Sequence, residues 1–208
     1  MTLLEFKIVL SNLFGNLIVG RNKGLFPFLM KTRKGIDICH SVIRDCSVVF
    51  EGKDNQLIIE KNCNIKGVEF SLEEGSEIKI EEGTFVYASK KQPTIIRASR
   101  NCKITIKRNC LLSNNVEIHT TDYHSVLTSE GEASNHDADV EIGEHTWIGL
   151  GCLILKGVFI KGDSVVAAKS VVTKSILESN CLIAGNPAKI VKKPIDWNID
   201  HCYKSVAK

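Results

Sequence analysis

The sequence predicts an all-β parallel solenoid from three observations: a six-residue repeat, a second series in phase with it, and small residues at regular corners. Between Ile142 and Leu177 an aliphatic residue recurs every six positions. The first series is Ile142, Ile148, Ile154, Ile160, Val166 and Val172, and the second, four places later, is Thr146, Cys152, Val158, Ser164, Ser170 and Ile176. Neither the helical period of 3.6 nor the strand period of 2 keeps this phase, whereas short strands joined at regular corners do.

Burial explains why such a repeat must stack. A six-residue unit cannot cover its own apolar side chains. When successive coils stack, each aliphatic side chain lies above another, and the backbone of each coil forms hydrogen bonds with the coil below. Small or flexible residues stand where tight corners need them. They are Gly143, Gly149, Gly157, Gly162 and Ala167.

The period continues upstream with less regularity, so we expect one solenoid domain over residues 36–193. Upstream positions in phase are Ile59, Ile65, Ile80, Val86, Ile106, Leu112 and Ile118, with Cys110 and Val116 in the second series. Slips fall at residues 71–77 and 89–101, and the longest break is residues 119–139. Solenoids place such insertions on one face, where they are free to bind or react.

Composition limits the classes of function. The chain has 208 residues, 43% of them apolar, which suits a single domain with a sizeable core. Its net charge of +3 is too small to indicate a nucleic-acid partner. Lysines gather at Lys189, Lys192 and Lys193, where an anion could bind.

The eight cysteines have neither metal-knuckle nor redox-motif spacing, and no secretory signal precedes them. Cys63, Cys110 and Cys152 fall at inward positions of the repeat, where a free thiol acts as a compact hydrophobe. We therefore expect a reducing, cytoplasmic location.

The two ends of the chain lie outside the repeat. Residues 1–35 are predicted to form an N-terminal helical segment, dense in apolar residues from Leu3 to Val19 but too polar to span a bilayer. This segment either packs against the solenoid flank or a neighbouring subunit, or lies on a membrane surface as a peripheral anchor. The tail, residues 194–208, is expected to form a short helix or arm carrying Trp197 and Tyr203.

The long insertion is the predicted place of chemistry. It holds His119, His124 and His136 in a polar context. Histidine is the side chain best suited to take and return a proton near neutral pH. Any of the three is a candidate general base on this ground.

Three motifs carry a resemblance to a known family. They are TDYH at residues 121–124, IGEHTWIG at 142–149 and AGNPAKIVKK at 184–193. With the repeat, they make residues 112–192 similar to the hexapeptide-repeat acyltransferases, which are left-handed β-helix enzymes. Their order and spacing resemble the maltose and galactoside acetyltransferases and the capsule polysaccharide O-acetyltransferases of bacteria.

The resemblance implies an acetyl-CoA-dependent O-acetyltransferase acting on a sugar hydroxyl of a capsular or surface polysaccharide or its precursor. His124 then corresponds to the general base of a direct transfer, and Asp122 either orients its imidazole or shapes the turn. The family forms homotrimers whose sites use the groove between adjacent subunits.

The resemblance also implies where the donor binds. Trp147 would lie against the acyl group of the coenzyme A donor. Gly149, Ala168, Thr173 and Lys174 would line the pantetheine and phosphate path, and Lys189 and Lys192 would meet the nucleotide phosphates. Some relatives carry a hydroxyl residue near Leu150, which here has only its backbone N–H to offer a developing oxyanion.

Parts of the sequence also fit other functions. His119 and His124 have the H-x4-H spacing of the γ-class carbonic anhydrases, but a third histidine is needed and none stands between Ser41 and Ile118, so no metal is expected. A non-catalytic β-helix scaffold and an N-acyltransferase acting on an amino-sugar nucleotide remain open. The acceptor is also open: cations at Lys90, Lys91, Arg97 and Arg100, in or beside the segment 87–99, are either a solvated edge or a site for an acidic glycan.

Overall fold

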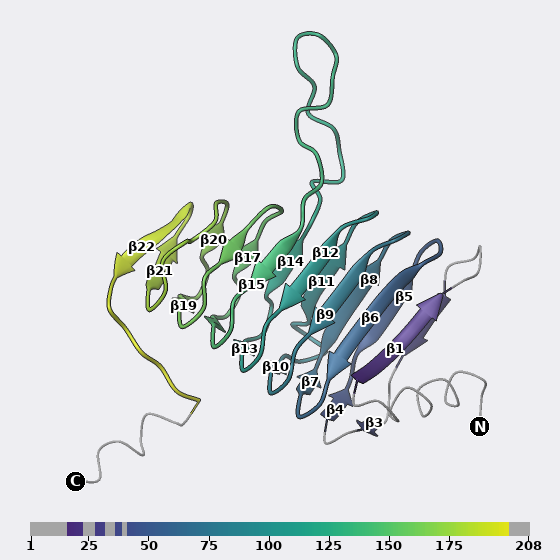
Figure 1. Ribbon diagram of the computed structural model, residues 1–208, viewed down its shortest axis with the longest axis horizontal. Helices are drawn as coiled ribbons and strands as arrows, with labels where there is room; N and C mark the ends of the chain where they lie inside the picture. The colour runs from purple at the N-terminus through teal and green to yellow at the C-terminus, as the bar shows by residue number, and fades with distance from the viewer. Residues whose placement is uncertain (1–15, 23–27, 32–35, 39–40, 200–208) are drawn as a thin grey trace.

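The computed structural model describes residues 16–22, 28–31, 36–38 and 41–199. Over them the chain winds as a parallel β-solenoid of about six turns (Figure 1). Each complete turn gives one strand to each of three sheets, because the chain bends at a corner after every short strand. The predicted all-β solenoid is confirmed.

The first sheet is six-stranded and carries ion pairs on its outer face. Its strands, in spatial order, are β1 (Asn16–Asn22), β6 (Asn55–Glu60), β9 (Glu77–Ile80), β12 (Lys103–Ile106), β15 (Val140–Ile142) and β18 (Phe159–Ile160). Opposite charges alternate on its outer face, as at Lys79, whose Nζ lies 2.9 Å from a Glu60 carboxylate oxygen. Because it is charged, this face of the sheet is suited to contact with solvent.

The second sheet has seven strands and leads to the protruding loop. Its order is β2 (Phe28–Lys31), β5 (Ser47–Phe50), β8 (Val68–Leu72), β11 (Thr94–Ala98), β14 (Glu117–His119), β17 (Leu153–Ile154) and β20 (Val171–Val172). The loop leaves at the end of β14 and returns at β15, so it stands at the corner between the second and first sheets (Figure 1).

The third sheet has nine strands and carries an outward row of apolar side chains. Its order is β3 (Ile36–Ile38), β4 (Ser41–Arg44), β7 (Asn64–Lys66), β10 (Phe85–Tyr87), β13 (Leu111–Leu112), β16 (Trp147–Ile148), β19 (Val165–Val166), β21 (Leu182–Gly185) and β22 (Ala188–Lys192). Strand register stacks Phe85, Leu111, Trp147, Val165 and Leu182 in successive coils. In one chain these side chains are only partly covered.

The inward residues follow the predicted repeat. All six members of the first series have no exposed surface, and the second series is buried as well, with Ile176 the most exposed at 8%. Cys63, Cys110 and Cys152 lie in the core as free thiols, as predicted. Burial raises the pKa of the Cys110 thiol to about 12.

The corners depend on close backbone approach and on left-handed residues. A Cβ on Gly149 would lie 2.6 Å from the backbone nitrogen of Ala168 in the next coil, so only glycine permits this spacing. Other corners use non-glycine residues with positive φ, such as Asn109 at 57° and Asn115 at 56°. Asparagine tolerates this conformation better than most residues.

The N-terminal strands cap the solenoid. β1, β2 and β3 pair antiparallel with β6, β5 and β4, so each sheet ends in a strand of reversed direction. Residues 16–22 and 28–31 are thus strand, where the sequence suggested a helical segment over 1–35. Most of that segment lies outside the described residues. The same holds for most of the residues expected to form a peripheral membrane anchor.

The C-terminal end is capped on one sheet by β22, which pairs antiparallel with β21. Residues 194–199 form an arm without helix or strand. Of the described residues, no helix has the length and apolarity needed to cross a membrane.

Candidate active site

The protruding loop is tied together at its base by Asn135. The side-chain amide of Asn135 donates to the Asp122 carboxylate at 2.8 Å and to the His124 carbonyl oxygen at 2.9 Å. Its Oδ1 accepts the Val126 N–H at 2.7 Å. One side chain thereby joins the outgoing and returning arms of the loop.

Lys156, from the corner after β17, anchors the loop to the solenoid. Its Nζ lies 2.6 Å from Oδ2 of Asp122 and also donates to the Asn135 carbonyl oxygen. The Lys156 ammonium, followed by the Asn135 amide, lowers the pKa of Asp122 below its ordinary value of 3.8. Asp122 therefore contacts His124 through Asn135 and the main chain, and in one chain its carboxylate does not reach the imidazole.

His124 is exposed and lines a polar cavity of about 270 Å³. The cavity is lined by Thr121, Asp122, Tyr123, His124, Ser125, Ala133, Asn135, His136 and Asp137. The His124 N–H donates to the Asp122 carbonyl oxygen at 2.8 Å, which fixes the main chain. Among the described residues none is hydrogen-bonded to the imidazole, and the residue is exposed. A general base needs this access.

His119 has a different environment from His124. It ends β14 and is 8% exposed. Its Nε2 lies 3.1 Å from a Glu117 carboxylate oxygen and its Nδ1 lies 3.2 Å from the Tyr123 hydroxyl. Among the described residues, no group of three or more His, Cys, Asp or Glu side chains could hold a metal ion.

A larger cavity, of about 450 Å³, runs over β5, β8 and β11 to the base of the loop. It is lined by Ser47, Val49, Glu51, Glu69, Phe70, Ser71, Glu73, Arg97, Ala98, Ser99, Thr121 and Tyr123. Of the four cations considered from sequence, Arg97 lines this cavity, whereas Lys90 pairs with Asp45 at 2.8 Å. Thr121 and Tyr123 line both cavities and stand between them.

Trp147 lies on the third sheet with 37% of its surface exposed. The arm covers part of it: the Trp197 ring lies 6.0 Å from the Trp147 ring and stacks on His145 at 4.5 Å with 11° between the planes. The Trp197 Nε1–H also donates to the His145 carbonyl oxygen at 2.9 Å. The sequence placed Trp197 in an arm but gave no sign that it would meet Trp147.

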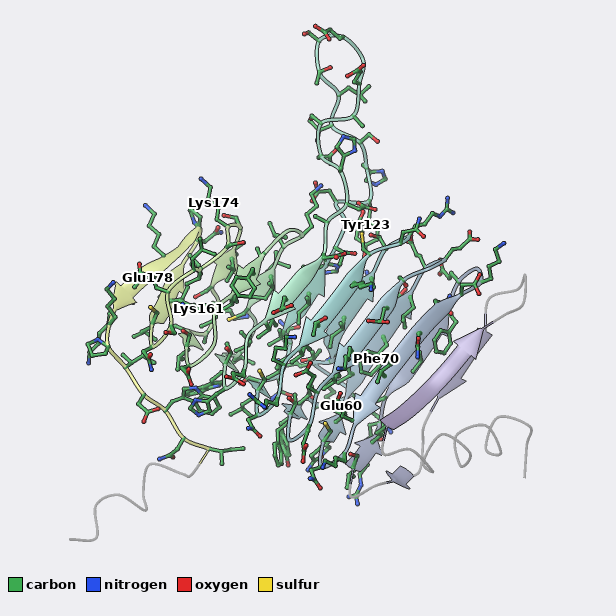
Figure 2. All side chains as sticks on the ribbon, in the orientation of Figure 1. Glu60, Phe70, Tyr123, Lys161, Lys174 and Glu178 are labelled. Carbon is green, nitrogen blue, oxygen red and sulfur yellow. The ribbon has the colours of Figure 1, made fainter. Side chains whose placement is uncertain are left out.

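The residues expected to hold the donor are distributed over the last coils. Gly149 and Ala168 meet at one corner, two residues beyond Trp147 and Val166 respectively. Thr173 and Lys174 follow β20 and are exposed. Figure 2 shows Lys174 on the outside of the last coils. Lys189 and Lys192 are exposed on β22, opposite Ala184 and Leu182. The structure thus brings Gly149, Ala168 and Trp147 near one another and leaves the four others on the outside of the final turns.

Sequence reasoning missed several residues that shape the site. Asn135, Lys156 and Glu117 act through contacts that depend on how the loop returns to the solenoid. Tyr123 was within a motif already singled out, and its place beside a predicted base was a usable signal.

Known proteins of similar sequence are named as acetyltransferases. A polysialic acid O-acetyltransferase of Neisseria meningitidis is 36% identical over 159 residues, which cover 74% of this chain and 72% of that protein. A putative acetyltransferase of Saccharomyces cerevisiae, YJL218W, is 33% identical over 172 residues, covering 80% and 84%. The polysialic acid O-acetyltransferase of Escherichia coli O1:K1 is 33% identical over 140 residues, but these are 67% of this chain and only 43% of that protein.

Solved structures give the same result. The polySia-specific acetyltransferase NeuO superposes with a TM-score of 0.71 at 30% identity, over 76% of this chain and 70% of that one. The polysialic acid O-acetyltransferase OatWY gives 0.68 at 35% identity, over 80% and 77%. No family model matches the sequence. The shared solenoid and the length of these matches show that the chain belongs to the hexapeptide-repeat O-acetyltransferase family.

Proposed function

We propose that the protein transfers an acetyl group from acetyl-CoA to a hydroxyl of a saccharide, in a capsular or surface polysaccharide or its precursor. The proposal depends on one observation: His124 is exposed and lines a polar cavity on the protruding loop. The chain belongs to a family of O-acetyltransferases, in which such a side chain can serve as a base. The Neisseria and E. coli relatives are named for polysialic acid, which supports a glycan as the class of acceptor.

In the proposed reaction, His124 acts as general base in a direct transfer. A ring nitrogen takes the proton of the acceptor hydroxyl as the oxygen attacks the thioester carbonyl carbon. The new C–O bond forms, the C–S bond breaks, and the leaving thiolate takes the proton back from the imidazolium. No acyl-enzyme forms, and the backbone of the loop holds the base in place through Asn135.

We further propose that the working enzyme is a trimer. His124 stands on the loop after the second sheet, whereas Trp147 lies on the third sheet, and neither cavity that Thr121 and Tyr123 line includes Trp147. A site needing both residues is incomplete in one chain. The outward apolar row on the third sheet supplies a surface for a neighbouring copy.

The donor would lie between the copies, along the last coils. Lys189 and Lys192 offer exposed positive charge for its phosphates, and Ala168 is exposed at the corner where it packs against the buried Gly149, two residues beyond Trp147. Lysine attracts phosphate as a point charge without the bidentate geometry of arginine. Free buried thiols fit the reducing cytoplasm, where we place the reaction.

Release of free thiol from acetyl-CoA tests this function. The acceptors to compare are maltotriose, chitotriose, a galactose oligosaccharide and a short oligomer of sialic acid, each with the purified protein. Acceptor-dependent thiol release supports transfer, and lability of the product to hydroxylamine distinguishes an ester from the amide that an N-acyltransferase would make. Failure of every acceptor to stimulate release would leave the non-catalytic scaffold as the better account.

A further inference from the structure

Glu117, His119 and Tyr123 form a hydrogen-bonded chain that the proposed transfer does not use. Glu117 Oε2 lies 3.1 Å from His119 Nε2, and His119 Nδ1 lies 3.2 Å from the Tyr123 hydroxyl. His119 is almost entirely buried, while Tyr123 is 53% exposed. This row of hydrogen bonds therefore begins on β14 and ends at the hydroxyl of an exposed tyrosine.

The direction of the hydrogen bonds follows from the chemistry of the groups. An ionised carboxylate only accepts, so the His119 tautomer that bonds Glu117 carries its proton on Nε2 and presents a bare Nδ1. The Tyr123 hydroxyl then donates its single proton to Nδ1. Arg97 Nη1, at 3.4 Å, donates to the same phenolic oxygen. A phenolic oxygen so arranged has accepting capacity left for one more donor.

The backbone at Tyr123 is held in an uncommon conformation. Its φ is 64°, in the left-handed region that a residue with a Cβ adopts at a cost. The Tyr123 N–H donates to Thr121 Oγ1 at 3.0 Å, and the Tyr123 ring meets the His119 ring edge to face at 6.0 Å. This turn directs the Tyr123 side chain back over β14 while the next residue, His124, lines the loop cavity.

The Tyr123 hydroxyl belongs to a side chain that lines both cavities. The groove of about 450 Å³ ends at Tyr123, and the cavity of about 270 Å³ that contains His124 begins there. A saccharide lying in the groove with one hydroxyl near His124 must pass this side chain. Such a ligand carries many O–H donors, which are what the free accepting position requires.

Resting on the proposed function, we infer that Tyr123 binds the acceptor saccharide through its hydroxyl, and that Glu117 and His119 are positioning residues that aim this hydroxyl. The acceptor class is then a hydroxyl-rich glycan that enters from the groove over β5, β8 and β11. His124 remains the base, and Tyr123 selects which acceptor hydroxyl lies next to it.

The test is Tyr123→Phe, which removes the hydroxyl and keeps the ring against His119. With the best acceptor of the four-saccharide panel, the acceptor KM should rise about tenfold, the effect of losing one good hydrogen bond, while the acetyl-CoA KM changes by less than about twofold. Tyr87→Phe is the matched control, because Tyr87 is 60% exposed and lines neither cavity. Its acceptor KM should equal that of the unmodified protein.

The role of His119 is tested by rescue. His119→Asn keeps a polar acceptor near the position of Nδ1 and should restore most of the acceptor affinity that His119→Leu loses. In a Tyr123→Phe background the same two variants should differ little, because the hydroxyl they aim is gone. A merely structural His119 would give losses that add to those of Tyr123→Phe.

Two different results would overturn the inference. If the unmodified protein is active and Tyr123→Phe matches Tyr87→Phe in acceptor KM, or raises both substrate KM values alike, Tyr123 is no acceptor contact although the proposed transfer stands. If the unmodified protein transfers acetyl to none of the four saccharides, the proposed function fails and this inference fails with it.

Discussion

Asn135 lies across the loop from His124, eleven residues away in sequence, and its side-chain amide donates to the His124 carbonyl oxygen at 2.9 Å. The bond holds the main chain of the predicted base while its imidazole stays unbonded by described residues. The backbone of His124 is therefore held in place, while its imidazole ring is free to turn toward a substrate. The same amide also reaches Asp122, so loop shape and base position are coupled.

Lys156→Met should raise the pKa of Asp122 toward its ordinary value of 3.8, because the lysine is the main cause of the lowered pKa. In the folded protein the ionised carboxylate stabilises the loop above that ordinary pKa, and the contribution is lost as pH falls through the lower folded pKa. Titration of the Asp122 carboxyl by NMR measures the change. Lys161→Met, at an exposed lysine of another corner, is the control, and an equal pKa in both variants would contradict the ion pair.

His124→Ala should lower kcat by about two to four orders of magnitude, the usual contribution of a placed general base. The affinity for acetyl-CoA should change little, since the donor is expected on the last coils. His136→Ala is a stringent control because His136 lines the same cavity. Equal losses of kcat in the two variants would show that the loop has a structural role and that the assignment of the base is wrong.

Trp147→Ala should raise the KM for acetyl-CoA and reduce kcat, because the ring is expected to contact the donor and to position its thioester. Lys189→Ala should raise that KM alone, and the effect should shrink with salt. Coenzyme A should also change the tryptophan fluorescence. Because Trp197 lies 6.0 Å from Trp147, the measurement is made in Trp197→Phe, and an unchanged spectrum at millimolar coenzyme A would argue against donor binding here.

Mixed trimers should recover activity that neither parent has. Subunits with His124→Ala and subunits with Trp147→Ala, refolded or co-expressed together, would place an intact His124 beside an intact Trp147 at some interfaces. Light scattering on the unmodified protein should give the mass of three chains. A monomer at micromolar concentration, or hybrids as inactive as the parents, would refute a shared site.

Ile96→Ala should destabilise the fold by about 2–5 kcal/mol, the usual cost of truncating a buried aliphatic. Ile96 has no exposed surface, whereas its neighbour Ile95 points outward on the same strand and is only partly buried. Ile95→Ala should therefore cost less in the free energy of unfolding, measured by urea titration. Comparable losses would mean that the alternation of β11 is not what stabilises this coil.

The solenoid could be predicted because its cause is local and repeated. Each coil buries the same positions, so the phase of Ile142 and its successors shows the inward face in the sequence itself. The protruding loop could be predicted for the same reason, because it is the longest interruption of the six-residue repeat. His124 was placed by a short motif, and the structure leaves its ring accessible, as that assignment needs.

The remainder depends on contacts that no local pattern encodes. The strand conformation of residues 16–22 comes from pairing with β6, nearly forty residues away, and an apolar run alone does not separate strand from helix. Trp197 meets His145 across 52 residues. The sequence marks His119 only as a candidate base or metal ligand, because the left-handed turn that brings Tyr123 back to it has no signature in the sequence.

The reversed strands at the N-terminal end have a consequence for how many coils can follow one another. A solenoid that ended on a bare coil would offer another molecule three strand edges in the same direction and spacing as its own interior, and stacking could continue into a fibre. β1, β2 and β3 run against that direction on all three sheets at once. They end the stack of parallel strands at the first coil, so removing β1, β2 and β3 should expose three parallel strand edges and favour association between molecules.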